Sequence, residues 1–239
     1  MHATLARCAL VLSTTTLFAV SAHAANLNPT LLTQSEFRLL TEDLGSALSY
    51  KPLIPAEAMG ITGFDIGIAV TGTALENRAV WQKASPGSDV PSTLPIPTIR
   101  VHKGLPFDID IGAMYGKVDN IQVAGGELRW AILPGSTAVP AFAVRASYTA
   151  LSGVDRLKLN TMGLDVSLSK GFAFLTPYVG AGVVKVKGTP DGGGLSSESL
   201  SQGKVFAGLN LNFGLVNLVF EGDRTGKATS YGAKLGFRF

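Results

Sequence analysis

The feature that most constrains this chain is an alternation of apolar and polar residues that returns about ten times between residues 61 and 239. In the first segment, Phe64, Ile66, Ile68 and Val70 are apolar, while Asp65 and small residues stand between them. Successive side chains of a β-strand point to opposite faces, so a period of two predicts strands with one apolar face. The chain is therefore predicted to be all-β over this region.

The polar face of these strands is unusual because it is small and sparsely charged. It consists mainly of Gly, Ala, Ser and Thr, and only 15% of the chain is charged, whereas a soluble domain carries about a quarter. The strands of a soluble β-sandwich, which is the alternative, would present a face rich in charged residues to water. Small residues with isolated charges favour an enclosed lumen, with the apolar face turned toward lipid.

Strand length and connection length support a membrane barrel. Segments of about ten residues suffice for a tilted strand to cross a bilayer, where backbone groups are all paired only in a closed barrel. The two longest links, residues 75–96 and 188–203, both follow odd-numbered strands, as the extracellular loops of bacterial barrels do. We expect residues 61–239 to form a transmembrane antiparallel up-and-down β-barrel of about ten strands, with eight or twelve as alternatives.

Residues 1–24 have the features of a secretory signal peptide. Arg7 precedes a short apolar core, and small residues at 22–24 fit a cleavage site. Cys8, the chain's one cysteine, lies in this segment, so the mature chain is expected to contain no disulfide. After this segment the sequence contains no run of eighteen apolar residues, so no membrane-spanning helix is predicted.

Residues 25–60 do not alternate and are predicted to form a short amphipathic helix before the barrel. Thr33 and Glu36 have the spacing of a capping box, and the helix is expected to reach about Tyr50. This helix could lie in either of two positions relative to the barrel. A lumen of this size is mostly filled by strand side chains, which favours a helix at the periplasmic mouth. The alternative is a plug inside the barrel, loosely similar to the N-terminal hatch of long-chain hydrocarbon and fatty-acid transporters.

The signal peptide, the amphipathic strands and the final strand together resemble those of Gram-negative outer-membrane β-barrel proteins. The final strand carries apolar residues at alternate positions and ends on an aromatic residue. This resemblance implies a place in the outer membrane among its lipids, delivery by periplasmic chaperones, and recognition of the last strand by the barrel-assembly machinery. The residues that match this insertion signal are Tyr231, Leu235, Phe237 and Phe239.

Charged residues on the polar faces are expected to pair inside the lumen, since removing one partner of a buried pair leaves an uncompensated charge. Asp65 is expected to face Lys234 where the first and last strands meet. A hairpin turn at residues 103–105 would set Arg100 opposite Asp108. The predicted lumen network comprises Asp65, Arg100, His102, Asp108, Glu127, Arg129, Arg145, Glu221 and Lys234.

Two further pairings follow from the same counting. The turn at 103–105 would place His102 opposite Pro106. The link at 133–139 would place Arg129 opposite Arg145, with Glu127 diagonal to both. Two guanidinium groups face to face require acid nearby.

The sequence carries little sign of catalysis. His102 is the one histidine after the signal peptide, and no Gly-x-Ser-x-Gly or phosphate-binding motif occurs. We therefore expect no enzyme, no cofactor and no metal site, and a net charge of +3 is too small to indicate nucleic-acid binding. The predicted function is a narrow pore or a transporter of small or apolar solutes. The alternatives are a structural or surface-interaction barrel that anchors extracellular loops and, more weakly, an outer-membrane lipid- or peptide-modifying enzyme.

Overall fold

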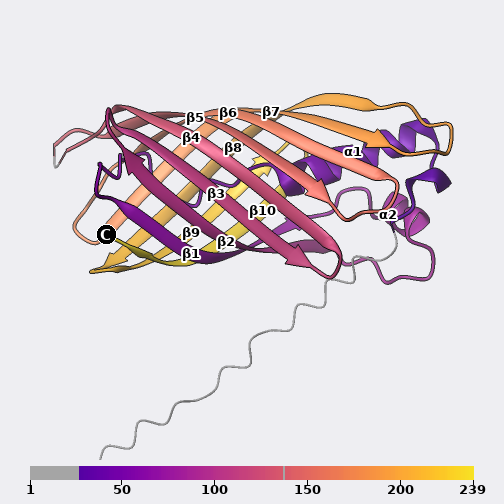
Figure 1. Ribbon diagram of the computed structural model, residues 1–239, viewed down its shortest axis with the longest axis horizontal. Helices are drawn as coiled ribbons and strands as arrows, with labels where there is room; N and C mark the ends of the chain where they lie inside the picture. The colour runs from indigo at the N-terminus through magenta and orange to yellow at the C-terminus, as the bar shows by residue number, and fades with distance from the viewer. Residues whose placement is uncertain (1–26, 137) are drawn as a thin grey trace, which may run out of the picture.

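The computed structural model of the protein describes residues 27–136 and 138–239, so the predicted signal peptide lies outside the described residues. Ten antiparallel strands close into one barrel, in which each strand pairs with its neighbours in sequence and β1 pairs with β10 (Figure 1). The predicted ten-stranded up-and-down barrel is confirmed. The strands are β1 Phe64–Ala74, β2 Thr93–Leu105, β3 Ile109–Val118, β4 Ile121–Leu133, β5 Ala141–Ser152, β6 Leu157–Ser169, β7 Leu175–Pro190, β8 Glu198–Phe213, β9 Val216–Thr225 and β10 Ala228–Arg238.

The alternation of the sequence becomes an apolar outer wall and a polar lumen. On β1, Asp65 is fully buried inside the barrel, whereas Ile68 is 62% exposed on the outside. An apolar belt of this kind suits contact with hydrocarbon rather than with water. It includes Ile66, Ile68, Val70, Ile99, Ile111, Tyr115, Leu128, Trp130, Tyr148, Met162, Leu164, Val166, Leu168, Val179, Val183, Val205, Phe220, Tyr231, Leu235 and Phe237.

The two ends of the barrel differ in their connections. Links after odd-numbered strands meet at one end, which we call the α2 end because the longest link contains helix α2 (Arg78–Ala84). The other end, called the C-terminal end, carries Phe239 (Figure 1). Bacterial barrels have long extracellular loops and short periplasmic turns, so we assign the α2 end to the outside.

The predicted external loops at 75–96 and 188–203 were too long. β7 extends to Pro190 and β8 begins at Glu198, because the ladder continues through polar pairs such as Lys187 opposite Ser199. Likewise β2 begins at Thr93. Amphipathic alternation marks only the part of a strand that faces lipid, whereas backbone pairing continues beyond it.

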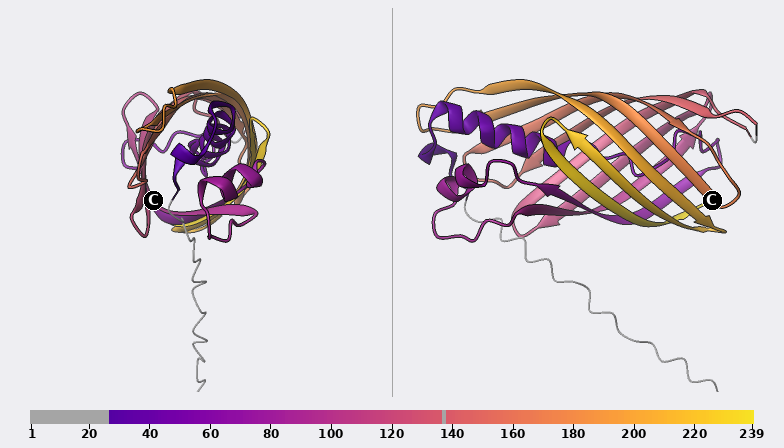
Figure 2. Two further views of the ribbon diagram at one scale, coloured as in Figure 1. Left: turned by 90° about the vertical axis from the view of Figure 1, so that its right-hand side faces the viewer. Right: turned by 180° about the vertical axis from the view of Figure 1, so that it is seen from behind.

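The segment before the barrel enters the lumen. After a short turn η1 (Pro29–Leu31), helix α1 (Gln34–Leu48) begins at the predicted capping box of Thr33 and Glu36. The end-on view in Figure 2 shows α1 inside the ring of strands, at the α2 end. Neither α1 nor α2, the α-helices of the described part of the chain, is long and apolar enough to cross a membrane.

Residues 49–60 then run in an irregular path along the lumen to the C-terminal end, where β1 starts (Figure 2). We call residues 27–60 the plug. The expectation of a helix at the periplasmic mouth is wrong. The apolar stripe of α1, which includes Phe37 and Leu40, packs instead against lumen-facing apolar residues such as Leu159 and Val186. Those side chains would otherwise face water, so burial of both surfaces stabilises the helix inside the barrel.

Candidate functional site

The lumen contains most of the charges that the sequence placed there. Among the described residues, six basic side chains are buried: Lys51, Arg100, Arg129, Arg145, Lys204 and Lys234. Seven acidic side chains are buried with them: Asp43, Asp65, Asp110, Glu127, Asp165, Glu221 and Asp223. His102 is fully buried as well. Five of the six basic side chains form ion pairs with these carboxylates, whereas Arg100 donates to backbone carbonyl oxygens.

Asp108 does not belong to this network. It is exposed and lies in the turn between β2 and β3, where Phe107 and Asp108 have φ values of 66° and 56°. Proline and aspartate favour such turns, so β2 continues through Leu105 and the turn is formed by residues 106–108. The prediction placed the turn three residues too early.

This later turn changes the register of the hairpin. Arg100 stands opposite Met114, and His102 stands opposite Gly112. The predicted pairings of Arg100 with Asp108 and of His102 with Pro106 are therefore wrong. Asp110, two residues further along, is the β3 carboxylate that faces the lumen.

Asp65 and Lys234 meet across the seam between β1 and β10. Lys234 Nζ lies 2.7 Å from Asp65 Oδ1 and 2.9 Å from Oδ2, and Asn217 Nδ2 donates to Oδ2 at 2.8 Å. In the backbone register, however, Lys234 is opposite Ala69 and Asp65 is opposite Arg238. The long lysine side chain therefore reaches along the barrel to the carboxylate.

Arg129 and Arg145 face each other on β4 and β5, with carboxylates on either side. Arg145 Nε lies 2.8 Å from Glu127 Oε2, and Arg145 Nη1 lies 3.1 Å from Asp165 Oδ1. Arg129 Nη2 lies 2.6 Å from Asp110 Oδ2. The two guanidinium groups are thus each paired with acid rather than left against one another.

His102 lies between two of these carboxylates. Its Nδ1 is 3.8 Å from Asp65 Oδ1, and its Nε2 is 3.4 Å from Glu127 Oε1. The side chain has no solvent exposure. This geometry ties neighbouring ion pairs into one cluster, and a dissolved substrate has no direct access to the imidazole.

The extended part of the plug is bound to the wall by the same charged side chains. Lys51 Nζ lies 2.8 Å from Asp223 Oδ1. Arg100 Nη1 donates to the carbonyl oxygen of Lys51 at 2.6 Å, and Glu221 accepts from the backbone N–H of Leu53 at 2.9 Å. These bonds satisfy an irregular backbone that has no ladder of its own.

Further wall residues continue this binding toward the C-terminal end. Arg129 donates to the carbonyl oxygens of Pro55 and Glu57. Asp110 accepts from the backbone N–H of Met59 at 3.2 Å. The lumen charges therefore serve two purposes at once, because they neutralise each other and hold the plug.

Sequence reasoning missed six of these buried charges: Asp43, Lys51, Asp110, Asp165, Lys204 and Asp223. Four of them, Asp110, Asp165, Lys204 and Asp223, lie on strands at lumen-facing positions. Assigning every second residue of each strand to the lumen would have found these four. No pattern would have indicated Lys51, because its position depends on the irregular path of residues 49–60.

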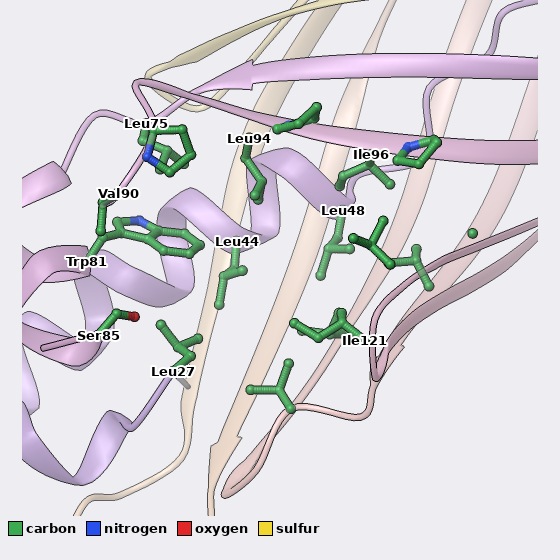
Figure 3. Close-up of a pocket in the computed structure, with 18 of the residues that line it drawn as sticks. Leu27, Leu44, Leu48, Leu75, Trp81, Ser85, Val90, Leu94, Ile96 and Ile121 are labelled. Carbon is green, nitrogen blue, oxygen red and sulfur yellow. The ribbon is translucent and has the colours of Figure 1, made fainter. Parts of the chain in front are cut away.

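A second feature, an apolar pocket, lies at the α2 end between the plug and β2–β4 (Figure 3). It is a cavity of about 100 Å³. Its polar lining side chains are Ser85, Asp89 and Lys117, and the remaining side chains are apolar. The apolar lining comprises Leu27, Leu44, Leu48, Leu75, Trp81, Val90, Pro91, Leu94, Pro95, Ile96, Pro97, Val118, Ile121, Val123, Leu151 and Val154.

The sequence did contain a signal for this pocket. Leu94, Ile96, Val123 and Leu151 are apolar residues on strand faces that turn toward the lumen. They interrupt the rule that the lumen-facing positions are small or polar. Read together, they mark an apolar layer at one end of the barrel.

The pocket is covered by α2, and the Asp43 carboxylate of α1 binds the start of α2 beside the pocket. Asp43 Oδ2 accepts from Trp81 Nε1 at 3.0 Å and from the backbone N–H of Asn77 at 2.9 Å. Burial raises the pKa of Asp43 above its usual 3.8, against the opposing effect of these hydrogen bonds. The contact positions the Trp81 ring over the pocket, as Figure 3 shows.

The protein is a closed barrel with an apolar outer belt and a charged lumen, and its longest connection lies at the α2 end. The chain has the architecture of an outer-membrane β-barrel. No protein-family model matches the sequence, and no curated protein matches it either.

Several solved structures of outer-membrane proteins are similar to this barrel at low sequence identity. Neisserial surface protein A is 13% identical over 74% of this chain and 95% of its own, with a TM-score of 0.31. Ail, the attachment invasion locus protein of Yersinia pestis, is 15% identical over 74% of this chain and 97% of its own, with a TM-score of 0.27. The translocator domain of the autotransporter NalP from Neisseria meningitidis is 12% identical over 86% of this chain and 95% of its own, with a TM-score of 0.35.

Proposed function

We propose that this outer-membrane barrel binds and transfers a small apolar molecule and is not a water-filled pore. The observation that carries the proposal is the apolar pocket at the α2 end. Ligand sites are concave and mostly apolar, with few polar groups, and this cavity fits that description. A cavity of about 100 Å³ is smaller than the engineered 150 Å³ cavity that binds benzene. The ligand is therefore no larger than a singly substituted aromatic ring or a short aliphatic chain.

The plug supports binding over free conduction. Residues 49–60 pass along the lumen and are held by side chains of β2, β3, β4 and β9. Interior side chains of a small barrel already fill most of its width. An ion would have to displace hydrogen-bonded backbone to cross.

The chain itself provides a fluorescent reporter for the test. Its two tryptophans are Trp81, which lines the pocket, and Trp130, which is 52% exposed on the outer wall. In a Trp130→Phe background, iodobenzene should quench Trp81 emission saturably in detergent, because its heavy atom occupies the pocket.

A matched pair of substitutions locates the site. Val123→Phe fills the pocket and should weaken the saturable quenching at least tenfold. Val205→Phe makes the same change on the lipid-facing wall, where the side chain is 55% exposed, and should leave quenching unchanged. Absence of saturable quenching would overturn the binding proposal. Steady ohmic current through the reconstituted protein would favour a pore. If neither saturable quenching nor current is observed, the barrel would instead be an anchor for external loops.

We also propose that the protein has no catalytic activity. The buried position of His102 between Asp65 and Glu127 supports a structural part for this residue. If so, His102→Gln should lower stability without changing any lipid or peptide processing in cells. Loss of such processing at normal protein levels would contradict this proposal.

We further propose export through a cleaved signal peptide, passage with periplasmic chaperones, and insertion by the barrel-assembly machinery. The placement of the final strand supports this route. Tyr231, Leu235, Phe237 and Phe239 all point outward and are between 46% and 72% exposed. Such a row is available to a partner before the seam with β1 closes.

A further inference from the structure

The wall of the barrel is incomplete between β2 and β3. Their pairing begins beside the turn and stops at Ile99 opposite Tyr115. Beyond that level, residues 93–98 pair only with β1, and residues 116–118 pair only with β4. The ladder therefore splits in the half of the barrel nearest the α2 end.

Pro97 accounts for the start of the split, and Pro95 lies level with the turn that follows β3. Pro95 and Pro97 lack the N–H that a ladder requires. A Cβ added to Gly116 would collide with the carbonyl oxygen of Pro97, so this edge of β2 points toward β3. In a strand, the backbone N–H and C=O groups of residues i and i+2 point to the same side. Pro95 therefore also faces the side of β3 and offers no N–H donor there. The interruption is consequently encoded in the sequence.

The split lies where the apolar pocket meets the outside of the barrel. A groove on the lipid-facing wall is lined by outward residues including Ile68, Ile99 and Phe220. Pro97, Gly116 and Lys117 line both this groove and the pocket. Pocket and groove are thus two sides of the same break in the sheet.

We propose that the split between β2 and β3 is a lateral portal, through which an apolar ligand passes between the outer leaflet and the pocket. This inference rests on the proposed binding function and adds the route and the ligand class. The ligand is an uncharged hydrocarbon that partitions into the bilayer, because both the groove and the pocket are apolar. An unpaired strand edge in hydrocarbon is costly, and the two prolines reduce that cost because the β2 edge carries fewer N–H donors that need a partner.

Locking the portal tests the route. Continuing the register from Ile99 and Tyr115 places Lys117 opposite Pro97, so Pro97→Cys with Lys117→Cys can bridge the strands at the base of the split. The matched control is Val101→Cys with Ala113→Cys, a pair already opposed in the intact ladder. Both are made with Cys8→Ser, which removes the chain's one cysteine, and with Trp130→Phe.

The measurement is the rate at which Trp81 is quenched when proteoliposomes are mixed with vesicles that carry iodobenzene. The oxidised portal lock should be quenched at least tenfold more slowly than its own reduced form, in which Pro97→Cys adds one N–H donor but no covalent bridge. The control lock should match the unlocked protein in both redox states. Quenching that is equally fast with the portal locked would overturn the portal but leave binding intact. No quenching in the unlocked protein would instead defeat the binding function itself.

A second variant covers failure of the disulfide to form. Pro95→Val with Pro97→Val restores two N–H donors to the β2 edge and allows the ladder to extend. This variant should also slow quenching in the vesicle assay at least tenfold. Because Pro95 and Pro97 line the pocket, the rate is normalised to the variant's own saturable quenching in detergent, which separates slower entry from weaker binding. An unchanged rate in a variant that migrates as a folded barrel would count against the portal.

Discussion

Lys51 on the plug and Asp223 on β9 form a buried ion pair, with 2.8 Å between Nζ and Oδ1. The same ammonium donates to the carbonyl oxygen of Ser46 and to the hydroxyl oxygens of Ser49 and Ser230. Such a fully bonded cation joins the end of α1 to the wall. The plug is therefore a fixed part of the fold rather than a loosely inserted tail.

Removing this cation should be costly. Lys51→Met leaves the Asp223 carboxylate buried without its partner, which is expected to lower the free energy of unfolding by about 3–5 kcal/mol. Urea unfolding in lipid vesicles would measure the change, and adding Asp223→Asn should recover part of it.

The control for Lys51 is Arg38→Met. Arg38 is 53% exposed and lies 3.5 Å from Glu42, so its loss should change the free energy of unfolding by less than about 1 kcal/mol. Equal effects of the two substitutions would show that Lys51 does not fix the plug.

The seam pair can be tested by charge reversal. Asp65→Lys places two ammonium groups together in the lumen and should strongly reduce the fraction of heat-modifiable folded barrel on a gel. Adding Lys234→Asp should restore part of that fraction, because the pair is re-formed with opposite polarity. Asp191→Lys, at an exposed loop position, provides the control. A double variant no better than Asp65→Lys alone would refute the coupling.

The last residue should matter for assembly. Phe239 exchanges two backbone hydrogen bonds with Phe64, and their ring centroids lie 5.6 Å apart. Phe239→Asp places a charge on the lipid-facing row and is expected to lower the outer-membrane level of folded protein several-fold. Arg238→Ala, beside it but on the opposite face, should have a smaller effect. Similar levels of both variants in isolated membranes would contradict the proposed insertion signal.

Docking of α2 on α1 should weaken in acid. Glu36 lies 2.7 Å from Lys83 Nζ, and its hydrogen bonds to Lys83 and Thr33 lower its pKa from 4.5 to about 2. A lowered pKa stabilises the folded state above pH 4.5, and this contribution is lost as the pH falls from 4.5 toward 2. Trp81 emission in the Trp130→Phe background should therefore change across this range.

Glu36→Gln isolates that contribution. This variant should lack the part of the emission change that belongs to Glu36. Asp43 also contacts Trp81, and its raised pKa makes it take up a proton at higher pH than Glu36 does. Since Asp43 is present in both proteins, the difference between their pH curves reports Glu36. Identical curves would show that the Glu36–Lys83 contact does not position α2.

The architecture of the wall could be predicted from the amino-acid sequence. Period-two alternation fixes which side chains face lipid, and closure follows because no strand edge can be left unpaired in hydrocarbon. The capping box of Thr33 and Glu36 likewise marked the start of α1, since its bonds are local. Lumen charges such as Asp65 and Arg145 could be predicted because the alternation along a strand assigns each side chain to either the lumen face or the lipid face.

The contacts of those charges and the contents of the barrel, in contrast, depend on tertiary packing. The turn at residues 106–108 set the β2–β3 register and excluded Asp108, because hairpin register depends on local turn geometry and not on alternation. The path of Lys51 and its neighbours has no sequence period, since each backbone group is satisfied by side chains distant in the chain. The pocket arises in the same way, where α1 and α2 meet an interrupted ladder.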